Sequence, residues 1–214
     1  MTWVLLLVIA VAPPKRDAST RWEKAIAALE ASDRKKPPPA SAVHFCGSSS
    51  IVMWPLEKSF PGWKVVKRGF GGSRIADSTR FAGRIITPHR PAAIVFYAGD
   101  NDLASGASPE KVRDDFRTFV ARVRQDCPET RILFLSIKPS ILRWKLWEKM
   151  KRANDLVKAE CGKGRGLAFI DIAPATLGDD GKPRKELFLK DGLHLSAAGY
   201  AAWSKVVAEA LEGR

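Results

Sequence analysis

Two groups of residues in this chain have types and spacing that suit acyl transfer. Three consecutive serines, Ser48–Ser50, follow Gly47 at the end of an apolar run. Serine favours neither strands nor helix interiors, so the triplet either caps a helix or contains a nucleophile. Near the other end of the chain, Asp191 precedes His194 by three positions. In a tight turn this spacing lets a carboxylate hold the imidazole Nδ1–H and leaves Nε2 free to accept a proton. Alone, this pair is a weak signal, since it can also shape a turn.

Possible donors to a developing oxyanion lie between these two groups. Gly71-Gly72 lets the main chain approach a ligand closely, and the loop is not a dinucleotide fingerprint because Arg74 occupies a glycine position. Asn101 carries a neutral amide that can donate to an oxyanion without adding net charge. Taken singly, Asn101 fits turn formation at least as well. The serines do not form the G-x-S-x-G elbow, because Ile51 stands where glycine is needed.

These residues need a scaffold, and the hydrophobic pattern predicts an α/β fold. Several apolar runs are continuous rather than alternating, which is typical of a parallel sheet covered on both faces. Helical patterns alternate with them, so we expect a three-layer α/β/α sandwich. The expected strands are 42–47, 64–67, 92–97, 131–137 and 167–171, and the expected helices are 20–33, 51–58, 74–85, 109–125, 143–160 and one from about 196.

The candidate residues all follow expected strands. The serines follow the first strand, the glycine loop follows the second, Asn101 follows the third, and Asp191 and His194 come after the fifth. Ligands of open α/β sheets bind beyond the carboxyl ends of the strands. The sequence therefore predicts that these residues meet at one edge of the sheet.

Taken in order, the segments resemble the four blocks of the SGNH hydrolase superfamily, also called the GDSL esterases. Gly47-Ser48-Ser49 resembles the G-D-S block, and Gly72 resembles the glycine that closes the second block. Gly99–Asp102 matches G-x-N-D, and Asp191–His194 matches D-x-x-H. The resemblance spans residues 43–200, and its one departure is Ser48 in place of the family's aspartate. That aspartate is not the triad acid, so we expect the chemistry to survive.

The resemblance implies a flavodoxin-like sandwich around a five-stranded parallel sheet, and a serine esterase that needs no metal or cofactor. It implies Ser49 as nucleophile, His194 as base and Asp191 as the acid that orients it. It also implies an oxyanion hole made by the N–H groups of Ser49 and Gly72 and the amide of Asn101.

The substrate is less constrained by the sequence. No lid-like insertion is visible, which favours short acyl chains, including acetylated saccharides. The candidate substrate-binding residues are Trp54, Arg74, Arg143, Trp144 and Trp147. For the last two tryptophans, packing of the following helix on the sheet is an equal alternative. Two other functions remain open. One is a thioesterase or lysophospholipase-like acylhydrolase, and the other is a non-catalytic basic module that binds polyanions.

Length and composition set the remaining expectations. The chain of 214 residues has a formal net charge of +13, but its basic residues are scattered, and we expect a small-molecule ester as partner rather than nucleic acid. We expect one hydrolase domain over residues 20–214, preceded by an apolar segment and linker over residues 1–19. The apolar stretch is too short for stable membrane insertion. If residues 1–12 act as a signal peptide, the protein is exported; otherwise it is cytoplasmic.

Overall fold

A computed structural model describes residues 20–213 of the chain. At its centre lies a five-stranded sheet in which all neighbouring strands are parallel, in the order β2-β1-β3-β4-β5. The strands are β1 Val43–Gly47, β2 Val65–Gly69, β3 Ala93–Tyr97, β4 Arg131–Leu135 and β5 Leu167–Ile170. This is the flavodoxin-like order, and it confirms the predicted fold class.

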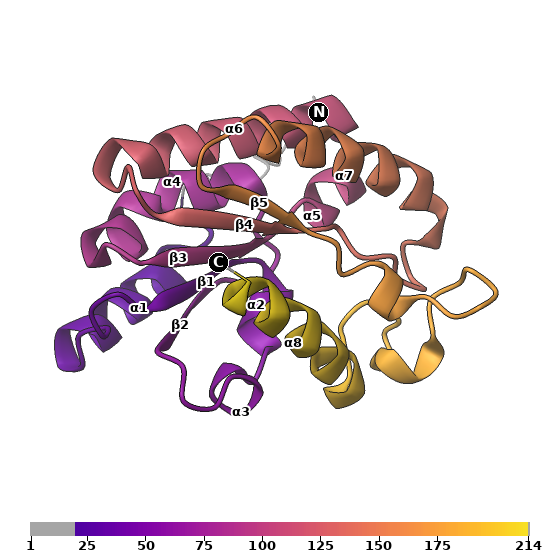
Figure 1. Cartoon of the computed structure of the whole chain (residues 1–214), viewed down its shortest axis with the longest axis horizontal. Coiled ribbons are helices and arrows are strands. Elements are labelled where there is room, and N and C mark those ends of the chain that lie inside the picture. The colour runs from indigo at the N-terminus through magenta and orange to yellow at the C-terminus, as the bar shows by residue number, and fades with distance from the viewer. Residues whose placement is uncertain (1–19, 214) are drawn as a thin grey trace, which may run out of the picture.

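Helices cover both faces of the sheet, as Figure 1 shows. One face carries α4 Ile75–Ile85, α5 Asp100–Ala104, α6 Pro109–Asp126 and α7 Trp147–Cys161, with α1 Glu23–Lys35 packed against α4. The other face carries α2 Ser49–Met53, α3 Leu56–Ser59 and α8 Ala197–Glu212. Short 3-10 turns lie at Thr87–His89, Trp144–Leu146, Pro174–Thr176 and Lys185–Leu187.

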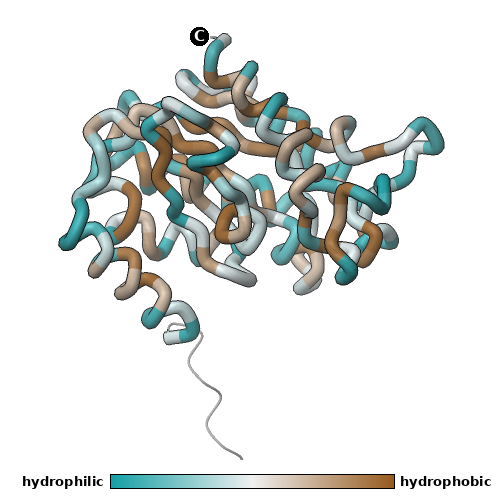
Figure 2. The backbone as a smooth tube through the Cα atoms, turned by 90° about the horizontal axis from the view of Figure 1, so that it is seen from below, coloured by the Kyte–Doolittle hydropathy of each residue, from teal (hydrophilic) through white to brown (hydrophobic). Residues whose placement is uncertain are grey.

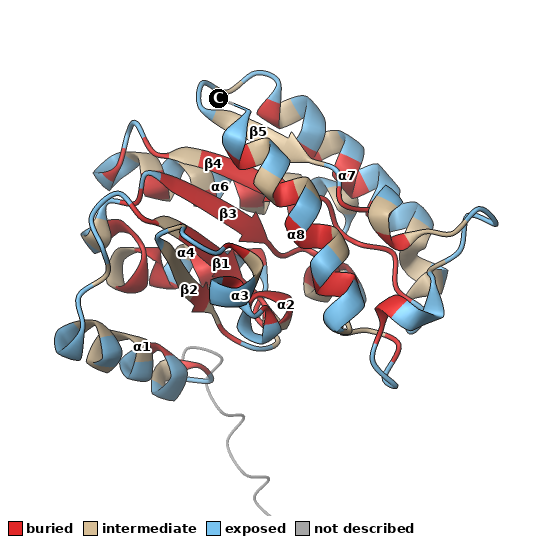
Figure 3. Cartoon of the chain, turned by 60° about the horizontal axis from the view of Figure 1, so that its bottom comes forward, coloured by how far each residue is buried: buried red, intermediate tan, exposed pale blue. Residues whose placement is uncertain are grey.

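Alternate residues of each strand enter two different hydrophobic cores. Cys46 of β1 and Phe96 of β3 pack under the α4–α7 layer, whereas Phe45 and Val95 pack under α2, α3 and α8. Figure 3 shows the central strands buried between exposed outer helix faces, and Figure 2 shows hydrophilic residues along both the helices and the outer loops. Burial on both sides explains why the central strand β3 is apolar throughout, whereas the edge strand β2 carries Lys67 and Arg68.

The observed elements differ from the predicted ones at two places near the site. The expected helix 51–58 begins earlier, at Ser49, and ends at Met53; α3 then begins after Pro55, which cannot continue a helix. The short helix α5 starts directly after Gly99 and was not predicted. The expected segment 1–19 lies outside the described residues. No helix within residues 20–213 is long and apolar enough to cross a membrane.

Candidate active site

A close approach of two strands positions the serine triplet. Gly47 ends β1 with a φ of +133°, and a Cβ there would lie 1.9 Å from the carbonyl oxygen of Tyr97 on β3. The next N–H, that of Ser48, donates to the same carbonyl at 3.1 Å. The main chain at Gly47 and Ser48 therefore stays in contact with the end of β3 as it leaves the sheet. Ser49 is then the first residue of α2. The N–H of a first helical residue has no acceptor inside the helix and can point at a ligand.

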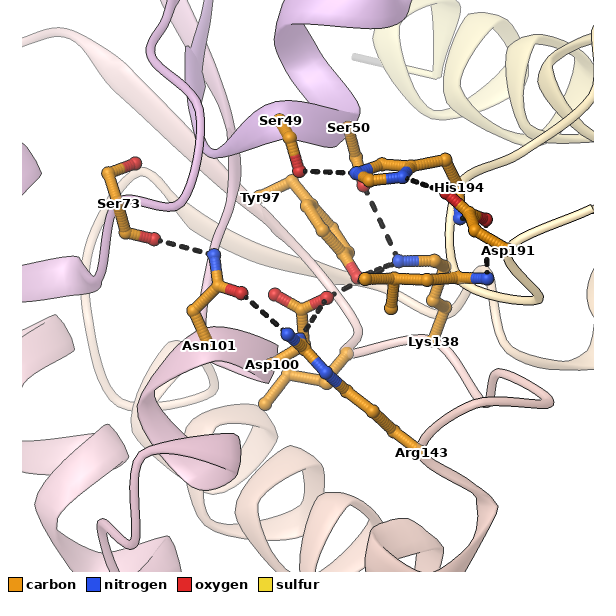
Figure 4. Close-up of polar contacts among 12 residues, drawn as sticks. Ser49, Ser50, Ser73, Tyr97, Asp100, Asn101, Lys138, Arg143, Asp191 and His194 are labelled. Atoms are coloured by element: carbon orange, nitrogen blue, oxygen red, sulfur yellow. Dashed lines mark hydrogen bonds and ion pairs between the residues drawn. The ribbon is translucent and has the colours of Figure 1, made fainter. Parts of the chain in front are cut away.

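The structure joins Ser49, His194 and Asp191 in one hydrogen-bonded chain, drawn in Figure 4. The Oγ of Ser49 lies 2.9 Å from Nε2 of His194, 145 positions later in the sequence. On the other side of the ring, Nδ1 lies 2.6 Å from Oδ2 of Asp191. The carboxylate at Nδ1 favours the tautomer that carries its proton there, which leaves Nε2 as the acceptor for the Ser49 hydroxyl.

Asp191 is held by the turn that it caps. Its Oδ1 accepts the N–H groups of Leu193 and His194, both at 2.9 Å. The hydrogen bond from His194, followed by these two main-chain donors, lowers the pKa of Asp191 to about 2. The side chain is thus an ionised partner for the imidazole throughout the neutral pH range.

The other two serines of the triplet face different partners. The Oγ of Ser50 accepts from Lys138 at 3.4 Å, and the carbonyl of Ser50 accepts from the hydroxyl of Tyr200 on α8 at 2.8 Å. Ser48 is buried, and among the described residues its Oγ has no hydrogen-bond partner. Of the three hydroxyls, the one that reaches the imidazole is that of Ser49.

The glycine loop and Asn101 close the other side of the site. Gly72 adopts a left-handed conformation, with a φ of +74°. The next residue, Ser73, donates its hydroxyl to the carbonyl of Gly47 at 3.2 Å and accepts from Nδ2 of Asn101 at 3.0 Å. The structure therefore brings the β2 loop and Asn101 to the strand end that carries Ser49, as the sequence predicts.

A buried polar network behind these residues was not predicted. Lys138 follows β4, and its side chain is 1% exposed. Its Nζ lies 3.0 Å from the Tyr97 hydroxyl and 3.3 Å from Oδ2 of Asp100, besides its contact with Ser50. Arg143 binds the same Oδ2 of Asp100 at 3.2 Å. The sequence signal was a lysine at the carboxyl end of an otherwise apolar strand.

The charges of this network compensate one another. Burial would raise the pKa of Asp100, but the nearby charges of Lys138 and Arg143 outweigh it and hold that pKa below its usual value. Burial lowers the pKa of Lys138, and the Asp100 carboxylate opposes this effect. Burial also raises the pKa of the Tyr97 hydroxyl, which remains neutral. Two cations around one carboxylate leave the network with a net positive charge.

Trp54, one of the predicted substrate-binding residues, does not reach the site. Trp54 is 0% exposed, its ring packs against Phe45 and Trp203, and its Nε1 donates to Ser59 and Ser204. Assigning it to a substrate pocket was wrong, because the turn after α2 directs it into the core. Arg74 precedes α4, where it is half-exposed and pairs with Asp77.

The other three candidates lie on the segment between β4 and α7. Arg143 contacts Asn101 as well as Asp100, so its guanidinium is engaged within the protein. Trp144 stacks on Trp147 with ring centroids 6.2 Å apart, and Trp147 packs on the core below α7. Trp144 also borders an open cavity of about 460 Å³, together with Ile141, Asp180, Lys182, Pro183, Arg184, Lys185 and Glu186. Among residues 20–213, no cluster of three or more His, Cys, Asp or Glu side chains could hold a metal ion.

Comparison with known proteins identifies the family. The model of the GDSL-like lipase/acylhydrolase family matches residues 49–202. The chain belongs to this family. The family is one of lipases and acylhydrolases, and the hydrogen-bonded serine lies at the start of the matched region.

Curated and solved relatives agree with this assignment. The chain is 31% identical over 118 residues to platelet-activating factor acetylhydrolase IB subunit alpha1 of Pongo abelii, a match that covers 52% of this chain and 48% of that protein. It thus spans about half the length of the curated relatives it matches.

Two solved structures share the fold. One, described as a platelet activating factor from Streptococcus pneumoniae, superposes with a TM-score of 0.81 at 22% identity, covering 90% of this chain and 94% of that chain. A GDSL-like lipase from Bacteroides thetaiotaomicron superposes with a TM-score of 0.72 at 17% identity, covering 91% and 97%.

Proposed function

We propose that the protein hydrolyses esters of short carboxylic acids through a covalent acyl-enzyme on Ser49. The observation that carries this proposal is the hydrogen-bonded chain from Ser49 through His194 to Asp191. His194 takes the hydroxyl proton as the Ser49 oxygen attacks the ester carbonyl, and Asp191 stabilises the imidazolium that forms. His194 then protonates the departing alcohol. A water molecule, deprotonated by the same imidazole, releases the acid and restores Ser49.

The negative charge of both tetrahedral intermediates needs donors. The N–H of Ser49 at the start of α2, the N–H of Gly72 and the Nδ2 of Asn101 are the proposed oxyanion hole. Nδ2 carries two hydrogens, and one is used by the carbonyl of Ser73, so the second is available to the oxyanion. Removal of one such donor typically costs a factor of about 10²–10³ in kcat.

A short acyl group fits the wall around Asn101. Hydrogen bonds join Asn101 to Ser73 on one side and to Arg143 on the other, which makes this wall polar. A long alkyl chain would gain no apolar contact there. The acetylhydrolase that matches half of this chain supports an acetyl group as the first choice.

The alcohol part is proposed to lie toward the cavity that Trp144 borders. Leu142, two positions earlier, donates its N–H to the carbonyl of Gly192 at 3.0 Å, so this segment adjoins the loop of Asp191. Aromatic and mixed polar side chains suit a sugar, and acetylated saccharides are therefore the proposed bulky substrates. Trp144→Ala should raise KM for an acetylated saccharide and leave KM for p-nitrophenyl acetate unchanged.

The test of the function is a panel of esters with graded acyl chains, from acetate to palmitate, together with a thioester and acetylated saccharides. We expect kcat/KM to be highest for acetate or propionate, and Ser49→Ala to abolish turnover. Ser48→Ala is the matched control, because the Ser48 hydroxyl has no partner among the described residues and should be dispensable. Full turnover by Ser49→Ala would refute the mechanism, and a preference for palmitate would refute the acyl size.

A further inference from the structure

The strongest unassigned feature is the connection between Arg143 and Asn101. One guanidinium nitrogen of Arg143, Nη2, donates to Oδ1 of Asn101 at 2.9 Å. On the opposite side of the amide, Nδ2 donates to the Ser73 carbonyl at 3.0 Å. These two bonds specify which end of the amide is oxygen and which is nitrogen, and they prevent rotation about the terminal torsion, which is otherwise broad.

The buried carboxylate of Asp100 holds Arg143 in place. Its other terminal nitrogen, Nη1, lies 3.2 Å from Oδ2 of Asp100, whose side chain is 6% exposed. Lys138 binds the same oxygen at 3.3 Å. The rigid guanidinium fork can contact a carboxylate and an amide oxygen at once, a geometry that a lysine ammonium on its flexible stem does not reproduce.

The same network also reaches the nucleophile's helix. Lys138 donates to Oγ of Ser50, the residue after Ser49, at 3.4 Å. A continuous chain of contacts thus runs from Ser50 through Lys138, Asp100 and Arg143 to Asn101, as Figure 4 shows. The main-chain donor of Ser49 and the side-chain donor of Asn101 are therefore fixed with respect to each other by buried charged groups.

We propose that Arg143 is a positioning residue for the oxyanion hole: through the network with Asp100 and Lys138, it orients the Asn101 amide so that Nδ2 faces the substrate oxygen. The proposal rests on the proposed function and goes beyond it, because Arg143 acts through Asn101 and not by contact with substrate. Catalysis gains from donors that need no reorganisation when charge develops. A freely rotating Asn101 would present its oxygen to the oxyanion for part of the time.

The test is a double-mutant cycle on kcat for p-nitrophenyl acetate, with Arg143→Met, Asn101→Ala and the double variant. We expect Arg143→Met to lower kcat about tenfold or more, with KM within about twofold of wild type, since only transition-state binding is lost. In the Asn101→Ala background, Arg143→Met should have no further effect, because the amide it orients is absent. Equal effects of Arg143→Met in both backgrounds would overturn the proposal.

Two further variants separate orientation from charge and from surface effects. Arg143→Lys keeps the positive charge but cannot bridge both groups, so it should stay within about threefold of Arg143→Met; full recovery would overturn the proposal. Arg152→Met, at an exposed position of α7 that pairs loosely with Glu110 at 3.8 Å, is the control and should match wild type.

Folding and the proposed function are monitored separately. Circular dichroism and a urea titration establish that each variant is folded, and Arg143→Gln replaces the Met variant if the latter unfolds. If Ser49→Ala is inactive while Arg143→Met has wild-type kcat, the positioning role fails and the esterase mechanism stands. If Ser49→Ala is active, both fail.

Discussion

The hydroxyl of Tyr200 donates to the main-chain carbonyl of Ser50 at 2.8 Å, across 150 positions of sequence. This bond fastens α8, which follows the loop of His194, to the turn that carries Ser49. The segments that carry Ser49 and His194 are thus joined by this buried hydrogen bond as well as by the contact between the two side chains themselves.

The first prediction concerns this bond. Tyr200→Phe leaves the buried Ser50 carbonyl without its donor, so the free energy of unfolding in urea should fall by about 1–3 kcal/mol. Thr118→Ala is the control: that hydroxyl is exposed on α6 and bonds to the Asp114 carbonyl of its own helix, so its loss should cost less than about 0.5 kcal/mol. Equal stability of Tyr200→Phe and wild type would show that the bond contributes nothing.

The second prediction concerns the approach of β1 to β3. Gly47→Ala would place a Cβ 1.9 Å from the Tyr97 carbonyl, so the strands would have to separate. We expect little folded protein and no esterase activity. Gly181→Ala is the matched control, because Gly181 also has a positive φ, +71°, but a Cβ there meets nothing within 4 Å. Its cost should be limited to backbone strain of about 1–2 kcal/mol. If Gly47→Ala and Gly181→Ala gave equal yields of folded protein and equal stability, the close approach of β3 would not be what requires glycine at position 47.

A third prediction concerns the buried pair of Lys138 and Asp100. Lys138→Met removes one of the two cations around the Asp100 carboxylate and leaves Arg143, 3.2 Å away, as its partner. The fold should therefore lose less than the roughly 3–5 kcal/mol that a fully broken buried ion pair costs. Asp100→Asn leaves both buried cations without their carboxylate and should cost more than Lys138→Met. In the double variant Lys138→Met/Asp100→Asn the two losses should not simply add, because the two side chains interact directly. A urea titration of wild type, both single variants and the double variant measures this. An additive double variant would contradict the pairing.

The fourth prediction is a pH dependence of stability that has its origin outside the site. His44 on β1 is 0% exposed and lies near Arg68 and His89, which both contact Asp33. Burial, followed by the charges of Arg68 and His89, lowers the pKa of His44 to about 3. Below pH 6.5, His44 binds a proton in the unfolded chain but stays neutral in the folded chain. The free energy of unfolding therefore falls as the pH decreases toward 3.

The comparison with His44→Leu isolates this effect. Between pH 7 and pH 4.5, wild type should lose about 2–3 kcal/mol of unfolding free energy more than the variant does. Asp102, whose pKa burial raises to about 6, contributes with the opposite sign, but it is present in both proteins and cancels in the difference. Parallel pH profiles of the two proteins would contradict the buried, neutral state of His44.

The scaffold was predictable because local patterns carry it. Continuous apolar runs mark the strands, and small or polar residues soon after the first three mark the edge where Ser49, Gly72 and Asn101 meet. His194 comes to this edge from a loop well beyond the end of β5. Trp54 shows the limit of such reasoning. It stands five positions after Ser49, yet the end of α2 directs its ring into the core.

The supporting network could not be predicted for a different reason. Lys138 and Asp100 are 38 positions apart, and the sequence around each residue does not pair it with the other. Only the order of the strands, with β4 beside β3, places them together below the sheet edge. Pairing across a sheet depends on tertiary arrangement, which no local pattern encodes.

The most direct test of the account is to label the nucleophile. A serine-directed organophosphonate should react with the protein in a one-to-one ratio, and peptide mass spectrometry should locate the adduct at Ser49 while esterase activity falls in proportion. His194→Ala should abolish the labelling, because the hydroxyl then has no base. An adduct at Ser48 or Ser50, or full activity in protein that is completely labelled at Ser49, would contradict the assignment of Ser49 as the attacking residue.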